Sequence, residues 1–187
     1  MRIYWLALFL LLGSRVQAQT EKHSLLVGGG FAMRSGEGVH QFMFNPTVGW
    51  FAAKDLAIGG MVSFNGEKVG GVTSSSTGIG PFVRYYFGKA QTRPFVVSEW
   101  EYVQSNTKQS STSSSIKAQG NRLLLGLGFA AFLSETVALE GVTGYSYSKF
   151  KNTDANNGFA LRLGFGVYLN RKANKAFKEK MKPLEDE

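Results

Sequence analysis

The sequence contains no cysteine and has little proline and histidine. Of its 187 residues none is Cys, four are Pro and two are His. The absence of Cys excludes a disulfide framework and any thiolate metal site. His23 lies close to the N-terminus, and His40 lies near Glu37 without a recognisable partner Ser. Hydrolysis or acyl transfer needs a His that activates a Ser and is oriented by a carboxylate, so we expect neither an enzyme nor a bound cofactor.

Long apolar runs are also absent, except at the N-terminus. There, Arg2 precedes an apolar run from Ile3 to Leu12, and the small-residue sequence Val16-Gln17-Ala18 follows. A membrane-spanning helix needs roughly 20 apolar residues, and no later stretch reaches that length. A charged start, a short apolar run and a small-residue cleavage site are typical of a signal peptide. The sequence therefore predicts a signal peptide over residues 1–18, and a protein that is exported.

The charge is strongly basic. The formal net charge is +8, and removal of Arg2 and Arg15 with the signal peptide lowers it to +6. A basic surface often indicates nucleic-acid binding. In an exported chain, however, anionic lipid headgroups or surface polysaccharides are the expected partners, and no nucleic acid is expected.

Glycine and phenylalanine are abundant, with 23 and 15 residues, and they occur in short alternating runs. This pattern predicts an all-β chain with eight strands, because a side-chain period of two is typical of strands with one buried face. The predicted strands are Ser24–Met33, Gln41–Ala52, Leu56–Phe64, Thr77–Phe87, Pro94–Gln104, Asn121–Leu133, Val137–Tyr147 and Gly158–Leu169. Short links follow the second, fourth and sixth strands, and longer polar segments follow the others. The Ser/Thr-rich segment Ser105–Gly120 is predicted to be a mobile loop.

Each predicted strand has two unlike faces. In the last strand, one face carries Phe159, Leu161, Leu163, Phe165, Val167 and Leu169, whereas the other carries small residues and Arg162. Charges within the strands always fall on the less bulky face: Arg84, Glu99, Glu101, Arg122, Glu140 and Arg162. A narrow barrel needs small residues inside, and the continuous aliphatic face is too bulky to fit there. The pattern therefore favours a barrel in lipid, with its apolar face outside, over a soluble barrel.

The six charged residues are predicted to share one lumen. Arginines lie on alternate strands and glutamates on the strands between them, so we expect ion pairs, with Arg162 directed to Glu140 or another lumenal carboxylate. This network has two interpretations: a structural filling of the interior, or an ion path. A separate prediction concerns Pro46 and Pro81, which cannot donate a backbone hydrogen bond and are expected to mark β-bulges.

Five segments carry a resemblance to a known family. They are "LLVGGGFAM", "GIGPFVRYYFG", "LLLGLGFAAFLS", "VALEG" and "GFALRLGFGVYL". With these segments the chain resembles the small bacterial outer-membrane β-barrel proteins of the OmpA/OmpX-like, "porin family" type. The resemblance implies an eight-stranded antiparallel up-and-down transmembrane β-barrel over residues 19–170, in the outer membrane of a Gram-negative-type cell.

The resemblance also implies an orientation and partners. Long loops are expected outside the cell, both termini in the periplasm, and residues 171–187 as a polar periplasmic tail. Outer-membrane lipid and lipopolysaccharide would surround the barrel. The barrel assembly machinery would read the last strand, where Arg162, Gly164, Val167 and Leu169 resemble its recognition signal.

The function predicted from these features is structural or interactive at the cell surface. Two alternatives remain open from the sequence. One is a narrow porin-like channel for ions or small solutes. The other is an adhesin that binds a surface ligand through the long outer loops, with Ser105–Gly120 as the segment to test.

Overall fold

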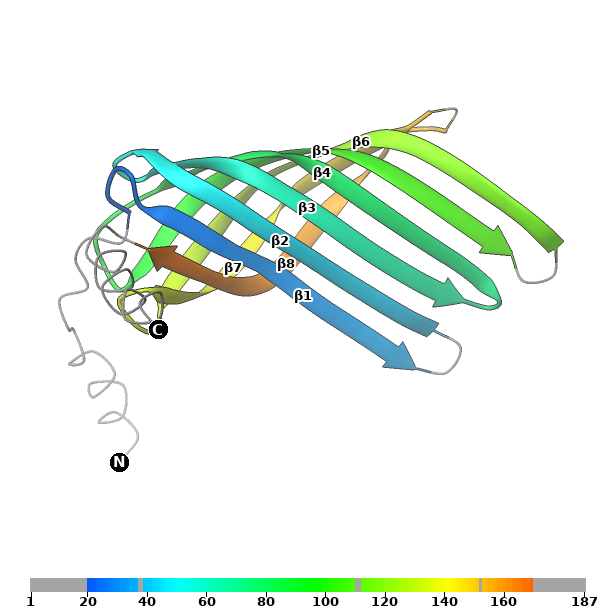
Figure 1. The fold of residues 1–187 in the computed structure, drawn as a ribbon, viewed down its shortest axis with the longest axis horizontal. Helices are drawn as coiled ribbons and strands as arrows, with labels where there is room; N and C mark the ends of the chain where they lie inside the picture. Colours follow the sequence, from blue (N-terminus) through cyan, green and yellow to red (C-terminus); the bar gives the residue numbers. More distant parts are fainter. Residues whose placement is uncertain (1–19, 37–38, 110–111, 152, 170–187) are drawn as a thin grey trace, which may run out of the picture.

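The computed structural model describes residues 20–36, 39–109, 112–151 and 153–169 (Figure 1). The predicted signal peptide, residues 1–18, and the predicted tail, residues 171–187, lie outside this part of the chain. In the described part, no helix is long and apolar enough to cross a membrane.

Eight antiparallel strands form one closed barrel in the order β1 to β8. The strands are β1 Leu25–Gly36, β2 Val39–Ala53, β3 Leu56–Val69, β4 Val72–Tyr86, β5 Thr92–Gln109, β6 Thr112–Phe132, β7 Val137–Phe150 and β8 Asn156–Leu169. Each strand pairs with its neighbours in the sequence, and β8 pairs with β1 to close the ring. This confirms the predicted fold class.

The barrel has two unlike ends (Figure 1). At the turn end, short connections join β2 to β3, β4 to β5 and β6 to β7. Thr20 and Leu169, the first and last described residues, also lie at this end: Thr20 hydrogen-bonds to Asp55 in the β2–β3 connection, and Leu169 pairs with Leu25. At the hairpin end, consecutive strands are joined as four hairpins: β1–β2, β3–β4, β5–β6 and β7–β8.

The prediction that Ser105–Gly120 forms a mobile loop is wrong. β5 continues to Gln109 and β6 begins at Thr112, and the two remain paired in register from Gln104 opposite Gln119 to Lys108 opposite Ser115. Threonine is β-branched and favours strands, and hairpin extension satisfies the backbone without a hydrophobic face. The low-complexity composition therefore marks a polar hairpin instead of a loop.

The two predicted proline bulges are also wrong. Pro46 stands opposite Gly29 of β1, and Pro81 stands opposite Gly60 of β3, each in continuous register. On the other side of each proline, the ladder skips a few pairs and resumes in the same register. The missing N–H therefore costs local pairing but does not shift the strand. Register shifts occur instead between Phe51 and Ala53 and between Lys108 and Gln109.

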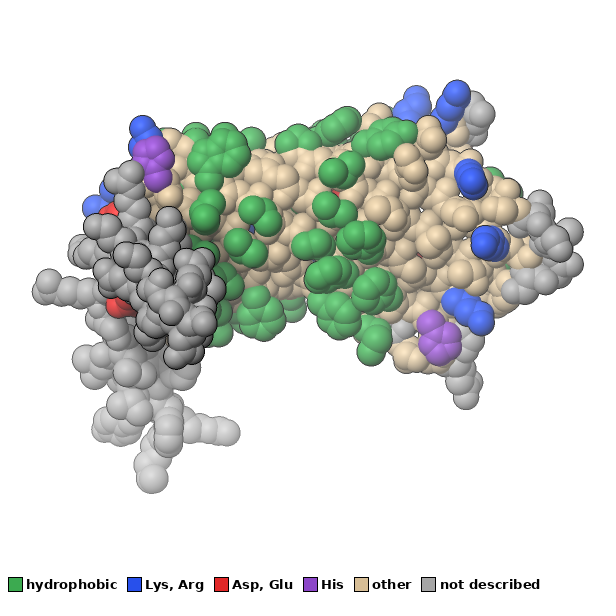
Figure 2. All heavy atoms as spheres, in the orientation of Figure 1, with side chains coloured by type: hydrophobic (Ala, Val, Ile, Leu, Met, Phe, Trp, Pro, Cys, Tyr) green, Lys and Arg blue, Asp and Glu red, His purple; other side chains and the backbone are tan. Residues whose placement is uncertain are grey.

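The predicted division of residues between an outer, bulky face and a lumenal face is confirmed in the strands to which faces were assigned. The bulky residues of β8 point away from the barrel, and Phe159, Leu161 and Leu163 are 89, 75 and 58% exposed. Figure 2 shows such hydrophobic side chains across the visible face of the barrel wall. Together, the exposed apolar residues between the turn end and the polar hairpins form the apolar belt. The inward residues form the buried core: Leu26, Phe51, Ala57, Met61, Phe82, Tyr86, Phe95, Val97, Leu124, Ala130, Phe132, Ala138, Val142 and Tyr168.

Candidate functional site

The turn-end half of the lumen is closed by a floor of aromatic rings. Phe51, Tyr86, Phe95, Phe132 and Tyr168 come from five different strands, and each is at most 1% exposed. Ring centroids lie 4.8 Å apart for Phe132 and Tyr168, 5.0 Å for Tyr86 and Phe95, and 5.6 Å for Phe51 and Tyr86. These are the spacings of packed aromatic pairs. A lumen filled in this way leaves no open passage through its floor.

An ion pair lies directly on this floor. Arg84 of β4 donates to Glu140 of β7, with 2.7 Å between Nη1 and Oε2, and the two side chains are 4 and 8% exposed. The Tyr168 hydroxyl donates to the other Glu140 oxygen at 2.6 Å, and lies 3.0 Å from the Tyr86 hydroxyl. The Arg84 guanidinium also covers the Phe95 ring at 5.2 Å. The buried carboxylate is thus held by a cation and a hydroxyl together, as a buried charge requires.

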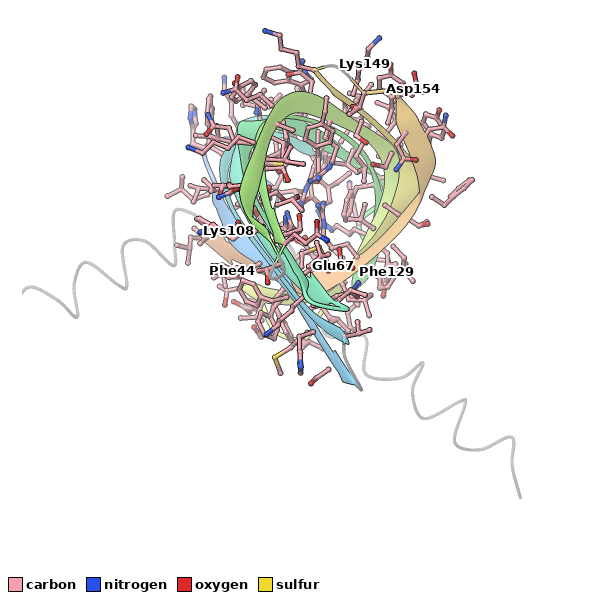
Figure 3. The ribbon with its side chains drawn as sticks, turned by 90° about the vertical axis from the view of Figure 1, so that its right-hand side faces the viewer. Phe44, Glu67, Lys108, Phe129, Lys149 and Asp154 are labelled. Carbon is pink, nitrogen blue, oxygen red and sulfur yellow. The ribbon has the colours of Figure 1, made fainter. Side chains whose placement is uncertain are left out.

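Two further ion pairs lie above the floor, toward the hairpin end. Arg122 donates to Glu101, with 3.0 Å between Nη1 and Oε2, and these residues are directly opposite on β6 and β5. Arg162 of β8 donates to Glu99 of β5 across the lumen. Figure 3 looks into the barrel from the hairpin end, where nitrogen- and oxygen-bearing side chains fill the interior.

The six predicted lumenal residues are therefore brought together as three pairs, one between neighbouring strands and two across the lumen. Only Glu101 and Arg122 belong to neighbouring strands. Arg162 contacts Glu99, and Glu140 is taken by Arg84 instead. The alternation of the sequence places a residue in the lumen, but it does not say how far across the lumen a long side chain reaches.

A fourth charged cluster was not predicted. Arg93 at the start of β5 lies 3.5 Å from Asp55 in the β2–β3 turn, and both residues hydrogen-bond to Thr20. In the sequence, Asp55 and Arg93 lie in or beside short links between strands, where charged residues are common and do not indicate a contact. Their opposite charges in two links at the same end of the barrel are the feature from which this contact could have been predicted. The cluster fastens the segment before β1 to the turn end.

Above the floor the lumen holds a cavity of about 270 Å³. Its lining combines the two upper ion pairs with apolar and amide side chains: Met43, Asn45, Asn65, Glu99, Glu101, Arg122, Leu124, Ser146, Ala160, Leu161 and Arg162. Below it, beside Arg84 and Glu140, the free space shrinks to about 10 Å³. The lumen is therefore a blind cavity that ends at the floor.

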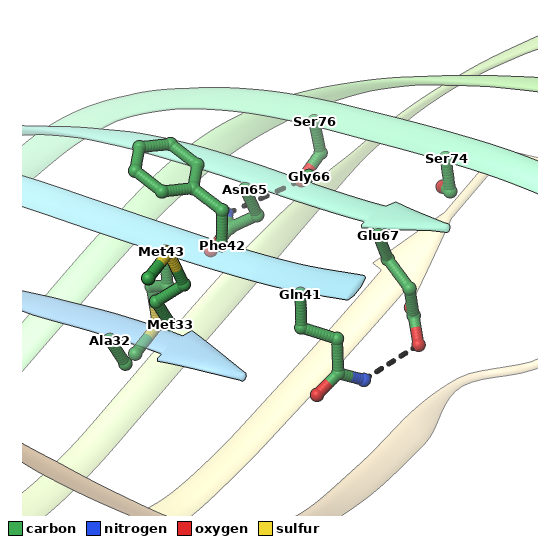
Figure 4. A pocket seen from close by; sticks show the side chains of 10 residues that line it. All are labelled: Ala32, Met33, Gln41, Phe42, Met43, Asn65, Gly66, Glu67, Ser74 and Ser76. Atoms are coloured by element: carbon green, nitrogen blue, oxygen red, sulfur yellow. Dashed lines mark hydrogen bonds between the residues drawn. The ribbon is translucent and has the colours of Figure 1, made fainter. Parts of the chain in front are cut away.

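A second pocket, of about 340 Å³, lies against β1 to β4 near the hairpin end (Figure 4). Gln41 donates to Glu67 at 2.7 Å in this pocket, and Asn65 donates to Ser76 at 3.3 Å. Both pairs are hydrogen-bonded across adjacent strands. The polar groups of this pocket therefore hydrogen-bond to one another, and the Gln41–Glu67 pair is exposed to solvent.

The histidines are not buried in a site. His40 lies on β2, with its Nδ1 3.0 Å from the Ser35 hydroxyl of β1, and this pair is exposed. The sequence did not suggest Ser35 as its partner, because the two approach across the β1–β2 hairpin. Among the described residues, no cluster of three or more His, Asp or Glu side chains is placed to hold a metal ion.

The four residues that resemble an assembly signal lie between Arg162 and Leu169, the last residue of β8. Arg162 and Gly164 face the lumen, whereas Val167 and Leu169 lie on the outer face and are partly buried. Gly164 stands opposite Gly30 of β1, and a Cβ atom at Gly164 would come within 2.3 Å of the Gly29 carbonyl oxygen. The glycine therefore permits the close approach of β8 to β1.

No protein-family model matches the chain. No curated protein matches it either.

Solved structures of other proteins do match its fold. The crystal structure of Neisserial surface protein A (NspA) superposes with a TM-score of 0.55 and 16% identity, over 79% of this chain and 96% of that one. The outer membrane protein OprG from Pseudomonas aeruginosa gives 0.54 and 13%, over 81% and 98%. The N-terminal β-barrel domain of Pseudomonas aeruginosa OprF gives 0.52 and 15%, over 78% and 97%. In fold, the chain is a small eight-stranded β-barrel of the kind found in outer-membrane proteins.

Proposed function

We propose that the chain is an outer-membrane protein of a Gram-negative-type cell, exported by its signal peptide, with a structural or surface-interaction role. The observation that carries this proposal is the outer surface of the barrel. Large apolar side chains are exposed on all eight strands, among them Val48, Ile79, Leu127 and Leu161 at 57, 63, 63 and 75%. Soluble monomers rarely expose contiguous apolar surface beyond a few hundred Å². A surface of this kind is stable when its solvent is hydrocarbon.

Closure of the barrel supports the same placement. In hydrocarbon every backbone group must be hydrogen-bonded within the protein, and closed barrels meet that condition. The internal ion pairs agree with it as well, since four arginines and four carboxylates are turned away from the apolar face.

We propose that the hairpin end faces the cell exterior and the turn end the periplasm. Short periplasmic turns and longer extracellular connections are the usual arrangement of such barrels. Exposed lysines lie in the parts of β3, β5, β6 and β7 toward the hairpin end: Lys68, Lys108, Lys117 and Lys149. Figure 2 shows Lys and Arg side chains gathered at that end of the visible face. Lysine side chains at this level suit the phosphates of lipopolysaccharide, which we propose as the surrounding lipid. Residues 171–187 would then extend from the turn end into the periplasm.

The last strand is the proposed recognition element for the barrel assembly machinery. Gly164, Val167 and Leu169 lie in the part of β8 that closes onto β1, and Arg162 lies two residues before it. Reading of this segment before folding would couple recognition to closure, because three of the four residues form the final seam.

The blind lumen favours a structural role over a channel. The floor and the Arg84–Glu140 pair block the axis, so we propose that the barrel does not conduct at rest. A second candidate function, binding of a surface ligand, is favoured by the β5–β6 hairpin. Its strands of 18 and 21 residues are the longest in the barrel, and the paired residues toward its outer end are mostly polar.

Cell fractionation with a gel-shift assay tests the proposal. The protein should be recovered with the outer membrane, with its mature N-terminus at Gln19, and should migrate differently in boiled and unboiled samples. Recovery as a soluble periplasmic protein without heat-dependent migration would contradict the proposal.

A further inference from the structure

The seam that closes the barrel is incomplete. β1 and β8 are joined over six residue pairs, from Leu25 opposite Leu169 to Gly30 opposite Gly164. Every other pair of adjacent strands is joined over twelve or more. The strands themselves are not short, because β1 continues to Gly36 and β8 begins at Asn156. Among the described residues, nothing pairs these two strands beyond Gly30 and Gly164.

The two strands diverge on the hairpin side of the seam (Figure 1). Continuing the same register would bring Phe31 opposite Leu163 and Met33 opposite Leu161, but these pairs are not formed. Instead Phe31 is 60% and Met33 72% exposed, and Phe159 on β8 is 89% exposed. All of them belong to the apolar belt. The opening therefore lies at the depth of hydrocarbon, on the side of the outer leaflet.

The lumenal cavity of about 270 Å³ reaches this opening. The unpaired half of β8 is the evidence, because Ala160, Leu161 and Arg162 all line the cavity and all lie beyond the last β1–β8 pair at Gly164. The unpaired edge of β8 therefore borders a cavity that also contains amide and charged groups. Irregular or unpaired backbone at membrane depth is tolerated where it lines such a polar cavity.

The cavity lining indicates what chemistry fits. Glu99 with Arg162 and Glu101 with Arg122 are neutral as pairs, so the base of the cavity does not select for a net charge. Met43, Leu124, Ala160 and Leu161 provide the apolar part of the lining. The volume lies just below the range of about 300–1,000 Å³ usual for small-molecule sites. One aliphatic chain fits this space, and a two-chain lipid does not.

We propose that the unpaired halves of β1 and β8 form a lateral opening through which a single-chain aliphatic molecule, of the fatty-acid class, passes from the outer leaflet into the lumenal cavity. The chain lies against Met43, Leu124 and Ala160, and its polar head lies near the edge backbone groups and the upper ion pairs. Because the floor is closed, the molecule is bound in the cavity and does not cross the membrane. The proposal rests on the membrane placement proposed above.

Photolabelling in phosphatidylcholine vesicles tests this binding. The probes are a medium-chain fatty acid with a diazirine at its chain end, and a phosphatidylcholine with the same diazirine in one acyl chain. Mass spectrometry of the illuminated protein locates the label. The fatty acid should label inward residues such as Leu124 as well as the outer surface, whereas the two-chain lipid should label only the outer surface. Absence of inward label from the fatty acid, or equal inward label from both probes, would overturn the proposal.

Three variants identify the path. Ala160→Phe fills the cavity and should reduce inward labelling several-fold, whereas Ala131→Phe adds the same side chain on the outer face and should leave it unchanged. Met33→Cys with Leu161→Cys permits a crosslink across the opening, and these are the only thiols because the chain has no cysteine. Crosslinking should abolish inward label and retain outer label. Inward label that persists after crosslinking, or in Ala160→Phe, would place the entrance elsewhere.

The gel shift separates the two proposals. A barrel that does not insert into vesicles contradicts the membrane placement. A barrel that inserts, shows the heat-dependent shift and takes up no inward label contradicts only the lateral opening.

Discussion

Arg84 and Glu140 are 56 positions apart in the chain and meet across the lumen at 2.7 Å, on a floor of buried rings. Neither residue is on a strand adjacent to the other, so the contact joins opposite walls of the barrel. With Tyr168 from β8 as the second donor to Glu140, three strands converge on one carboxylate. This contact makes the lumen a structural core and gives the first prediction.

Glu140→Gln should destabilise the barrel by about 3–5 kcal/mol, because Arg84 would keep its charge in a buried site without a counter-charge. Urea-induced unfolding in lipid vesicles measures the change. Glu135→Gln, at an exposed position in the β6–β7 turn, is the matched control and should have little effect. An increase in ion conductance without loss of stability would instead show that the pair is a gate.

The aromatic floor should block conduction. Wild-type protein in a planar bilayer is expected to give no steady single-channel current, and Phe51→Ala with Phe132→Ala should introduce one by opening the floor. Each truncation also costs about 3–5 kcal/mol, so the variant is assayed only after a gel shift shows a folded barrel. A stable current of the same size in wild type and variant would contradict a closed lumen.

Arginine substitutions at two exposed positions of β6 test whether the outer face of the barrel meets lipid or water. Leu127 and Gln119 are both exposed on the outer face, but Leu127 lies in the apolar belt and Gln119 lies in the polar part of the β5–β6 hairpin. In a bilayer, Leu127→Arg should cost about 2–4 kcal/mol of unfolding free energy, and Gln119→Arg close to nothing. Equal and small effects of the two substitutions would indicate water at both positions.

The six-pair seam should depend on the close approach of β8 to β1 at Gly164. Gly164→Ala places a Cβ atom 2.3 Å from a backbone oxygen that cannot move aside without shifting β1. We expect a loss of about 1–3 kcal/mol and a lower temperature for the gel shift. Gly158→Ala on the same strand meets nothing within 4 Å and is the control. Equal shift temperatures for the two variants would mean that the seam is not a weak point.

The β5–β6 hairpin should be removable without loss of the barrel. Ser105 stands opposite Ala118, so an Asn-Gly turn can replace residues 106–117 and connect the strands there. The shortened protein should still insert and show the gel shift, because only polar pairs beyond the belt are lost. If the hairpin binds a surface ligand, whole-cell binding of that ligand falls in this variant alone. A shortened protein that fails to insert would assign the hairpin to folding.

Much of this architecture follows from alternation. Residues such as Phe159 and Arg162 fall on opposite faces of any β-strand, and only the membrane interpretation makes the bulky face the outer one. Alternation does not give the distance between side chains across the lumen, so it could not predict which carboxylate Arg162 contacts. Composition misled at Ser105–Gly120, because Ser and Thr are common in loops and also suit solvated strands. Prolines at positions 46 and 81 misled for another reason, since a lost hydrogen bond need not shift a register.

The convergence at Glu140 has a consequence for biosynthesis. β8 is the last of the eight barrel strands to be synthesised, and it brings both Tyr168 to the floor and Arg162 to Glu99. A chain that stops before β8 therefore leaves Glu140 without its hydroxyl donor, Glu99 without its cation and the wall without closure. The lumenal contacts are complete only when β8 is present, so a product truncated before β8 lacks both the closed wall and these contacts.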